Sequence, residues 1–588
     1  MKTRAAATVF LLCAVAHAQQ SDVLMQAMKD EMARASELSL IAPDKPYLLR
    51  YSIEDATVFS ATATLGGLLS ASDRRFRLLS TRLRVGDYDF DNTDYVGSDY
   101  DPGVRYDSGQ LPIENDYAAL RSELWLSTDR AYKTAINAIA RKRAALASVN
   151  LAEKMPDYTQ APPVTLVEAV PVHPANQAAW EDRLRRVSAV FMGFPDVLAS
   201  DAEVQVIQSA DYMASTEGSL IRTPDDLAFV RISAYGQAPD GMPLRDADTL
   251  IAFDAASLPV EAELARAAKS IAEETTALAK APMGESWTGP VLFEPRAAAQ
   301  LFAQLLGDNL KLVRKPIPQP GQSIPWVGSE LEGRIGSRIL PEWMDVVDDG
   351  SQTEWHGVTL LGHYEVDDEG VRPRPTAMVE KGVLKTFLLT RTPPKPELAA
   401  GSNGHARFPG AFGEELPGMS NLFVRAEKTV PMADLKKQLM DLCRQRGKPY
   451  GLLVRKLDFP SSASVEEVRE IAAENMRSGG SGRPPVPPIL VYRVYADGRE
   501  ELVRGLHFRD LNTRSLKDIV AASDDSYVLN FLDAPVTFAL TGASGFVAAT
   551  SVIAPAVLFD ELEMVPATEE RPRVPIVPPP PLLARAAE

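Results

Sequence analysis

Cysteine is nearly absent from this chain. Its 588 residues include two cysteines, Cys13 and Cys443, and Cys13 lies in an N-terminal segment that we expect to be cleaved. A single remaining thiol cannot form an internal disulfide, so the stability of the protein must come from packing. A hydrophobic fraction of 45% is ample for that purpose. Cys443 lies in the helical stretch KKQLMDLCRQR, which predicts a structural thiol.

Several other signals are missing as well. Beyond the N-terminus no apolar run approaches the length of about 18 residues that spans a bilayer, so we expect no transmembrane segment. The formal net charge is −17, and no basic patch with interleaved aromatics occurs, which argues against a nucleic-acid binder. No Gly-x-Ser-x-Gly motif is present, so nucleophilic catalysis of that kind has little support.

The N-terminus has the three parts of a secretory signal peptide. Lys2 and Arg4 form a basic start, residues 5–15 are apolar, and Ala16-His17-Ala18 places small residues at the two positions that determine cleavage. We expect cleavage after Ala18. Leucine rather than a small residue precedes Cys13, which argues against a lipoprotein anchor. The mature protein is therefore expected to be exported, either to the periplasm or out of the cell.

The rest of the chain predicts an α+β fold in two parts. Hydrophobic periodicity predicts strands and helices that alternate up to residue 280, followed by mostly strand and turn. The expected helices cover residues 21–36, 118–147 and 259–280, and the expected strand regions cover residues 47–88 and 204–253. We place a signal peptide at 1–18, a helix-on-sheet domain at 19–256, a linker helix at 257–285, a mostly antiparallel β domain at 286–565 and a Pro-rich disordered tail at 566–588.

The stretch VLFEPRAAAQLF, residues 291–302, has a clear local interpretation. Residues 291–293 are a short apolar strand end, and Pro295 fits the first turn of a helix. Glu294 is favoured just before that turn because the helix dipole attracts negative charge. An apolar stripe then follows at Ala298, Leu301, Phe302, Leu305 and Leu306. The stretch predicts a strand, a turn and a helix whose apolar face is buried.

Short motifs in the second half are similar to those of a known family. Each is weak alone, but they occur in a fixed order between residues 288 and 565. They are Asp348-Asp349-Gly350, Val366-Asp367-Asp368-Glu369-Gly370, Val379 to Leu384, Gly401-Ser402-Asn403-Gly404, Pro417-Gly418-Met419-Ser420-Asn421 and Leu516 to Asp525. Together with VLFEPRAAAQLF they resemble the C-terminal domain of the TldD/PmbA metallopeptidases, and the resemblance implies the fold of that family.

The resemblance also implies how the chemistry differs here. Active members carry His-Glu-x-x-x-His where this chain has Phe293, Glu294 and Ala298, and a cysteine near the C-terminus completes their zinc site. Residues 538–547, FALTGASGFV, contain no cysteine. Glu294 is therefore the single residue that matches the family's catalytic motif, and no metal ligand or cofactor is expected.

The family offers a role for a chain without the metal motif. It contains PmbA-type subunits that lack the metal and pair with an active subunit. In such pairs a partly enclosed dimer admits small or unfolded peptides. The resemblance thus implies a homo- or hetero-dimer with a TldD/PmbA homologue, a peptide ligand, and a non-catalytic or degenerate subunit in extracytoplasmic peptide processing. One alternative is a homo-oligomeric peptide-binding protein without an enzyme partner.

A second alternative is an active metallopeptidase with relocated ligands. His363 and Glu365 share a face of a predicted strand, and His405 lies in a glycine-rich loop, so these three could form a replacement site. His356, seven residues before His363 on the same predicted strand, would face the opposite side. A polar strand residue is more often solvated or structural than a ligand.

The segment DYDFDNTDY partly resembles a calcium-binding loop. Asp87, Asp89 and Asp91 have the spacing that opens an EF-hand loop, but Asn92 and Ser98 stand where the loop needs glycine and glutamate. Alternation of aspartate with aromatic residues favours a strand with one solvent-exposed face.

Overall fold

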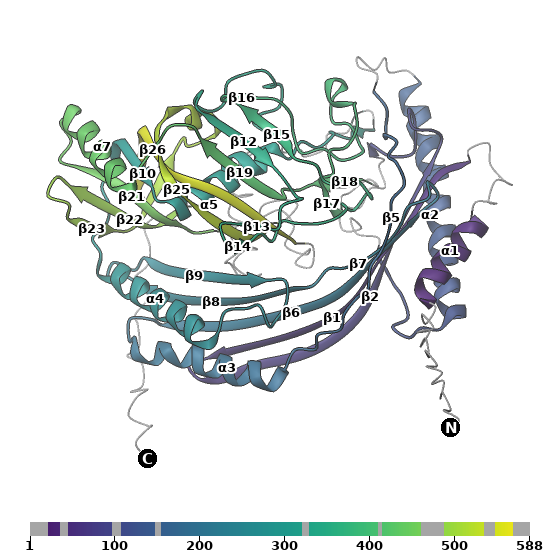
Figure 1. Ribbon diagram of the computed structural model, residues 1–588, viewed down its shortest axis with the longest axis horizontal. Helices are drawn as coiled ribbons and strands as arrows, with labels where there is room; N and C mark the ends of the chain where they lie inside the picture. The colour runs from purple at the N-terminus through teal and green to yellow at the C-terminus, as the bar shows by residue number, and fades with distance from the viewer. Residues whose placement is uncertain are drawn as a thin grey trace, which may run out of the picture.

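The computed structural model describes residues 22–35, 45–96, 108–147, 155–319, 321, 328–409, 414–459, 487–533 and 547–567. The N-terminal half runs from α1 (Val23–Ala35) to α4 (Glu261–Lys280), and the C-terminal half runs from β10 (Trp287–Phe293) to β26 (Ala548–Pro566). Each half contains one large sheet. In Figure 1 the N-terminal sheet forms an arch that runs beneath the C-terminal half.

A long hairpin forms the centre of the N-terminal sheet. Its strands are β1 (Pro46–Thr64) and β2 (Gly67–Val85), which pair along nearly their whole length. Leu65 and Gly66 connect them with φ angles of 45° and 81°. Positive φ at both positions is the signature of a type I′ turn, whose twist matches that of the flanking strands.

The remaining strands extend this hairpin into an eight-stranded sheet. The order is β4-β2-β1-β6-β7-β5, with β8 beside β6 and β9 beside β8. These strands are β4 (Ser108–Gln110), β5 (Thr165–Val167), β6 (Ala199–Ser215), β7 (Leu220–Pro224), β8 (Leu227–Gln237) and β9 (Pro243–Ala252). All of its pairings are antiparallel except that between β5 and β7.

Two helix pairs bury different ends of this sheet. Helices α1 and α2 (Tyr117–Leu146) cover one end, where Leu24, Met28, Leu120 and Leu124 join one apolar core. Helices α3 (Gln177–Ala189) and α4 cover the other end through a second core. Both pairs leave free the sheet face that is turned toward the C-terminal half (Figure 1).

The C-terminal half is built on a mixed sheet with one large apolar core. Nine of its strands follow the order β16-β15-β12-β19-β26-β10-β21-β22-β23, with β24 and β25 paired to β26 and β20 paired to β25. The bounds are β12 (Met344–Asp348), β15 (Thr376–Glu380), β16 (Val383–Leu384), β19 (Asn421–Ala426), β20 (Thr429–Val430), β21 (Tyr450–Leu457), β22 (Pro488–Tyr495), β23 (Glu500–Val503), β24 (Leu506–Arg509) and β25 (Ile519–Asp533).

Short elements complete the half. Helices α5 (Pro295–Phe302) and α7 (Met432–Gln445) pack against the sheet, and α5 continues through a π-helical turn, Ala303–Gly307, into α6 (Asp308–Leu310). The two-stranded pairs are β13 (Glu354–Trp355) with β14 (Val358–Thr359), β17 (Ala406–Pro409) with β18 (Glu415–Pro417), and β11 (Ile317–Pro318) with β3 (Tyr95–Val96). Short 3₁₀ turns lie at Val190–Gly193, Pro396–Leu398 and Thr513–Asp518.

Most predicted elements agree with the structure. The α+β class, the helix-on-sheet first half and the mostly antiparallel second half are confirmed, and the predicted helix at 118–147 is α2. The predicted helix at 259–280 begins slightly later, at Glu261. The tail prediction falls outside the described residues, apart from Pro566 and Ala567. No helix among the residues placed by the structure is long and apolar enough to cross a membrane.

Two strand predictions were wrong. The segment from Trp355 to His363 is not one strand, because His356 (φ 48°) and Gly357 (φ 82°) form the turn between β13 and β14. The His356 ring stacks on Trp355 with ring centroids 4.5 Å apart. The aspartate-rich segment after Gly86 is a loop, because Asp91 turns inward to bond with the Arg84 guanidinium at 2.7 Å.

Candidate functional site

The segment that resembles the metal motif is a packed structural element. As predicted, β10 ends at Phe293 and α5 begins with Pro295 at its first turn. Phe293 and Ala298 are fully buried. The Phe293 ring lies 5.8 Å from that of Phe508 and 5.4 Å from that of Phe559. An aromatic cluster therefore occupies the position where active family members place their first histidine.

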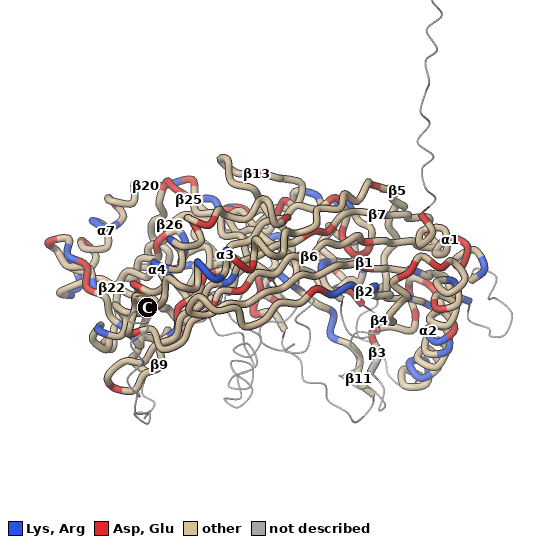
Figure 2. Tube along the Cα trace, turned by 90° about the horizontal axis from the view of Figure 1, so that it is seen from below, with Lys and Arg blue, Asp and Glu red and all other residues tan. Residues whose placement is uncertain are grey.

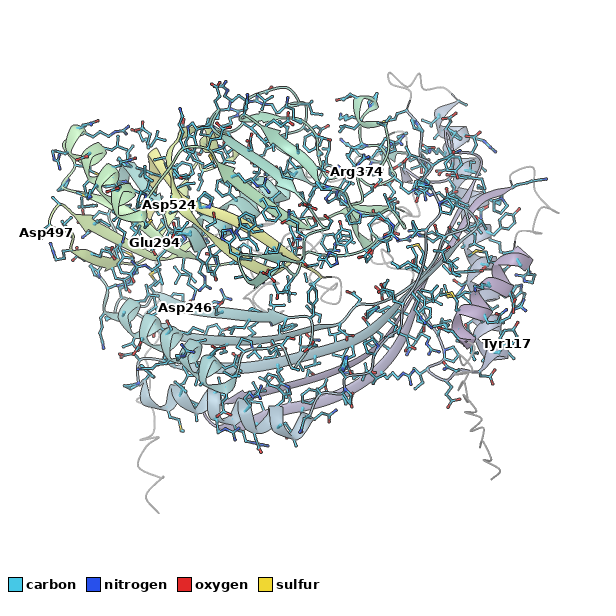
Figure 3. All side chains as sticks on the ribbon, in the orientation of Figure 1. Tyr117, Asp246, Glu294, Arg374, Asp497 and Asp524 are labelled. Atoms are coloured by element: carbon cyan, nitrogen blue, oxygen red, sulfur yellow. The ribbon has the colours of Figure 1, made fainter. Side chains whose placement is uncertain are left out.

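Glu294, the single catalytic candidate from the sequence, belongs to a group of four charged side chains. Its carboxylate accepts from the Arg455 guanidinium at 2.8 and 3.2 Å and lies 3.6 Å from the Lys436 ammonium. Both cations also pair with Glu500 at 2.8 Å. Figure 3 labels Glu294 in the C-terminal half and Asp246 on β9. Through these contacts the Glu294 carboxylate anchors α5 to β21. Because both of its oxygens are bound by cations, it is poorly placed to accept a proton from water.

Three of the sequence motifs meet around one buried carboxylate. His405, which is fully buried, directs Nε2 at Asp348 and Nδ1 at the side-chain oxygen of Asn403, both at 2.8 Å. The amide and the hydroxyl of Ser420 also donate to Asp348. These contacts join the Asp-Asp-Gly, Gly-Ser-Asn-Gly and Pro-Gly-Met-Ser-Asn motifs inside the protein, where they fix three loops to each other.

The neighbouring Asn421 explains a glycine in the same region. Its side-chain amide donates to the carbonyls of Asp349 and Gln352 at 3.0 and 2.8 Å, and its oxygen accepts from the Gly362 amide at 3.1 Å. A Cβ on Gly362 would lie 2.2 Å from the Ser420 carbonyl oxygen. Only glycine fits at such a close backbone approach.

The relocated metal site is not assembled. His363 directs Nδ1 at the Gly350 carbonyl at 2.8 Å, and its Nε2 lies 3.9 Å from the Glu365 carboxylate. Both ring nitrogens of His405 are already occupied in the buried network. Across the part of the chain that the structure describes, no group of three or more His, Cys, Asp or Glu side chains is arranged to hold a metal ion.

The aspartate loop and the cysteine have structural surroundings. Asp87 accepts from the amides of Asp89 and Phe90 at 2.9 Å, and Asp91 is fully buried. Asp94 is buried as well and faces Arg314 at 3.1 Å. Cys443 is buried on α7, where removal from water raises the pKa of the thiol to about 11. These surroundings favour neither calcium binding nor a reactive thiolate.

A cleft between the two halves is a further candidate site. It contains a cavity of about 330 Å³ and a neighbouring cavity of about 260 Å³, and the two cavities share several lining residues. The floor is the N-terminal sheet, through Asp211 and Thr223, and the roof is the loop at residues 361–368 with the start of β26. Such volumes lie at the small end of the range for ligand sites, roughly 300–1,000 Å³.

Carboxylates dominate the lining of this cleft. Glu54, Asp211, Asp225 and Asp368 line it, and no hydrogen bond or ion pair joins their side chains to any residue that the structure places. Glu54 and Asp211 are direct partners on β1 and β6, a pairing of like charges that destabilises a sheet. The group therefore has several carboxylates and few direct partners among the described residues.

One fixed cation lies at the edge of the carboxylate group. Arg407, the only lysine or arginine among the described lining residues, stacks over the Tyr364 ring at 4.0 Å. Its guanidinium donates to the Ala549 carbonyl at 3.2 Å. In Figure 2 acidic and basic residues are interspersed along the chain, whereas the described lining of the cleft has several carboxylates and one arginine.

The environment of the cleft raises the pKa of its carboxyl groups. Removal from water raises the pKa of Glu54 to about 7, and the charge of Asp225 adds to the rise. Removal from water, followed by the charge of Glu415, raises the pKa of Asp368 to about 8. Asp368 is still more than a third exposed to the cavity, so solvent screens part of this effect. The cleft is thus suited to a ligand that brings positive charge or many N–H donors.

Sequence reasoning missed most of this site. Glu54, Asp211 and Asp225 belong to no motif, and Asp368 entered only as part of Val-Asp-Asp-Glu-Gly. The residues come from β1, β6, the connection between β7 and β8, and a loop of the second half, so no local pattern brings them together. The one signal in the sequence that could have predicted the site is a carboxylate at an inward-facing position on each of two neighbouring predicted strands.

Known proteins match the second half of the chain. Residues 286–458 match the family model of the PmbA/TldA metallopeptidase C-terminal domain. A curated metalloprotease of Methanocaldococcus jannaschii is 31% identical over 98 residues, and one of Methanothermobacter thermautotrophicus is 35% identical over 98 residues. This part of the chain belongs to the TldD/PmbA family. Each match covers 16% of this chain and 20% of the relative.

The TldD/PmbA fold extends over nearly the whole chain. A solved structure from Thermotoga maritima superposes with a TM-score of 0.56 at 15% identity, covering 92% of this chain and 99% of that one. TldE from Thermococcus kodakarensis superposes with a TM-score of 0.55 at 14% identity, covering 92% and 100%. At such low identity the likeness establishes the fold.

The residues present do not fit the zinc of active TldD/PmbA members. A zinc site needs three or four nitrogen, sulfur or oxygen donors within about 2.0–2.3 Å of the metal. Phe293 and Ala298 supply no donor, and Glu294 is bound to Arg455. No cysteine occurs in residues 538–547, of which 538–546 lie outside the described residues.

Proposed function

We propose that this TldD/PmbA protein is a non-catalytic subunit that takes part in peptide processing outside the cytoplasm. In this proposal it pairs with a homologue that carries the metal, and the acidic cleft receives part of a peptide. The matches above place residues 286–458 in the family; the role, the location and the partner are our inference.

The packed motif segment carries this proposal. Phe293 and Ala298 have no exposed surface, and the Glu294 carboxylate is held by Arg455 and Lys436. Replacing a ligand-bearing turn by an aromatic cluster leaves the scaffold stable without metal. Family membership then suggests a binding or pairing role rather than hydrolysis by this chain.

The acidic cleft supports a peptide ligand. A peptide in an extended conformation offers N–H donors, and a basic side chain or a free amino terminus would offset the charge of Glu54, Asp211, Asp225 and Asp368. The spacing of these carboxylates does not create a metal site among the described residues, so an organic cation suits the cleft better. The expected signal peptide, with Lys2, Arg4 and cleavage after Ala18, supports an extracytoplasmic location.

Metal analysis of the mature protein is the primary test. We expect no stoichiometric zinc after purification and no chelator-sensitive cleavage of unstructured peptides. The alternative, a relocated site near His363 and Glu365, predicts bound zinc that is lost in His363→Ala. Zinc at one ion per chain together with chelator-sensitive cleavage would end the non-catalytic proposal.

A second experiment tests the partner. The tagged protein, purified from its native cell envelope, should carry with it a homologue that has the intact His-Glu-x-x-x-His motif. Peptide cleavage should then follow the pair and not this chain alone. Recovery of a self-dimer that binds peptide, without any homologue, would favour the homo-oligomeric binding protein instead.

A further inference from the structure

The two halves touch at both ends of the arch; ion pairs cross at both ends, but only one contact contains an apolar cluster among the described residues. The first contact, the apolar joint, lies where α4 leads into β10. Its buried cluster of Ala238, Leu244, Leu278, Ala279 and Leu490 is the one apolar cluster in the described chain with members from both halves. Ion pairs of Arg245 with Asp458 and of Lys456 with Asp246 lie beside it.

The second contact, the ionic joint, lies at the opposite end and contains buried charges. Arg391 of the C-terminal half makes a two-pronged pair with Glu217 of the N-terminal half at 2.6 and 2.7 Å. Arg314 also reaches across the halves, where it donates to the Asp157 carboxylate at 3.0 Å and to the Pro156 carbonyl at 2.9 Å. In return, Glu415 accepts from Arg50 and Arg82, and Glu369 accepts from Tyr158 at 3.1 Å.

Tyr158 is the centre of the ionic joint. Its ring lies between two guanidinium groups, with Arg84 at 3.9 Å and Arg391 at 4.2 Å from the ring centroid. Backbone hydrogen bonds also cross the joint, from the Thr159 amide to the Arg391 carbonyl at 2.8 Å and from Ile317 to Asp94 at 2.7 Å. No apolar cluster of the described residues spans this end.

The contrast between the joints has a mechanical consequence. The apolar cluster next to the covalent connection is held by burial of apolar surface, which does not depend on charged partners staying in place. A buried ion pair is stable only while both partners stay in place. If the pair separates, a charge that remains buried is strongly disfavoured, whereas a charge that reaches water is hydrated and is not. A separation of the halves therefore costs least if the ionic joint parts as a unit and its charges become hydrated.

We propose that the chain opens at the ionic joint, with the apolar joint as the hinge, and that this movement controls access to the acidic cleft. The cleft lies between the two joints, and its volume of about 330 Å³ is small for a peptide of several residues. Opening at the ionic joint widens the space between the sheet and the loop at residues 361–368. The peptide as occupant rests on the proposed function, whereas the movement does not.

Accessibility of a reporter cysteine tests the movement without any peptide or partner. Thr223→Cys places a thiol on the cleft wall, and its reaction with a bulky polymer-linked maleimide reports opening. Cys443 gives little background because it is buried. If opening and closing are fast relative to labelling, the rate follows the population of the open form.

Three variants in the reporter background decide the hinge direction. Arg391→Met removes the central pair of the ionic joint, Glu217→Gln removes only the charge of its partner, and Arg245→Met removes a matched interhalf pair at the apolar joint. We expect labelling to become about tenfold faster or more in Arg391→Met, faster to a smaller degree in Glu217→Gln, and unchanged within twofold in Arg245→Met. Circular dichroism confirms that each variant is folded.

Salt provides a test that needs no change in either joint. Raising the ionic strength from 0.1 to 1 M shortens the screening length from about 10 to 3 Å and acts mainly on charges that reach water. It therefore stabilises the open form, in which the charges of the ionic joint are hydrated, and the reporter protein alone should label faster. Equal labelling of the Arg391→Met and Arg245→Met proteins, or a larger effect of Arg245→Met, would overturn the proposal. So would a rate independent of both salt and Glu217→Gln. Failure to bind peptide would count against the proposed function and leave the hinge result unaffected.

Discussion

The repulsion among carboxylates in the cleft leads to a prediction about stability and pH. The substitution is Asp368→Asn, which keeps the shape of the side chain and removes its charge. The pKa of Asp368 rises from 3.8 to about 8, and each unit of pKa difference between folded and unfolded states corresponds to about 1.4 kcal/mol. Because Asp368 is more than a third exposed, screening reduces the expected gain on substitution to about 1 kcal/mol.

The sign of the pH dependence follows from the raised pKa. Below about pH 4 the carboxyl is protonated in both the folded and the unfolded protein, so its raised pKa does not lower the free energy of unfolding. Between pH 4 and pH 8 the unfolded chain loses the proton while the folded protein keeps it, and stability falls as the pH rises. Above pH 8 the carboxyl is ionised in the folded protein as well, and the loss of stability is complete. The Asn variant should therefore be more stable than the native protein above pH 8 and equally stable near pH 4.

Thermal unfolding at pH 4 and pH 8.5 measures this effect. At pH 8.5 the variant should unfold at a temperature about 2 °C higher, since 1 kcal/mol shifts the midpoint of a chain this large by only a few degrees. Asp524→Asn, on the exposed part of β25, is the matched control for removing one negative charge from the protein. A gain that is the same at both pH values, or the same in the control, would refute the argument that repulsion inside the cleft causes it.

Three further predictions concern the motif segments. Glu294→Gln should lower stability by about 0.5–1 kcal/mol, because the charge group is partly exposed and Glu500 still pairs with both cations; denaturant unfolding measures this, and a loss above 3 kcal/mol would contradict it. The double substitution Phe293→His with Ala298→His should bind no zinc and cost about 3 kcal/mol or more by disrupting the aromatic cluster; metal analysis and unfolding together check it. Gly362→Ala should cost about 2 kcal/mol because its Cβ meets the Ser420 carbonyl; an unchanged midpoint would show that the loop moves aside freely.

Local patterns in the sequence predicted the elements that depend on local rules. The stretch VLFEPRAAAQLF has a proline at a helix start and an apolar stripe, and both are present in β10 and α5. Helix α2 was predicted nearly to its ends because its buried residues recur at helical spacing over 30 residues. The motif order also located the loops that meet at Asp348, although their contacts could not be foreseen.

Distant contacts decided the parts that sequence reasoning missed. Asp91 alternates with aromatic residues as a strand residue would, but its partners are the Arg84 guanidinium and the Tyr47 hydroxyl at 2.7 Å, which draw the segment into a loop. The proposed metal ligand His405 is fully buried because Asp348, 57 residues earlier, holds it. The cleft forms only when the N-terminal sheet meets the second half, so its four carboxylates share no feature along the chain.

The aromatic cluster around Phe293 also affects how the sequence can change over evolution. A histidine at position 293 alone would lose the contacts with Phe508 and Phe559 and gain no metal, since the other ligands would still be missing. A histidine at 298 alone would have to replace a fully buried alanine and would gain no metal either. Either histidine taken singly therefore lowers stability without adding catalysis, so this chain is separated from an active peptidase by several substitutions that have to arise together.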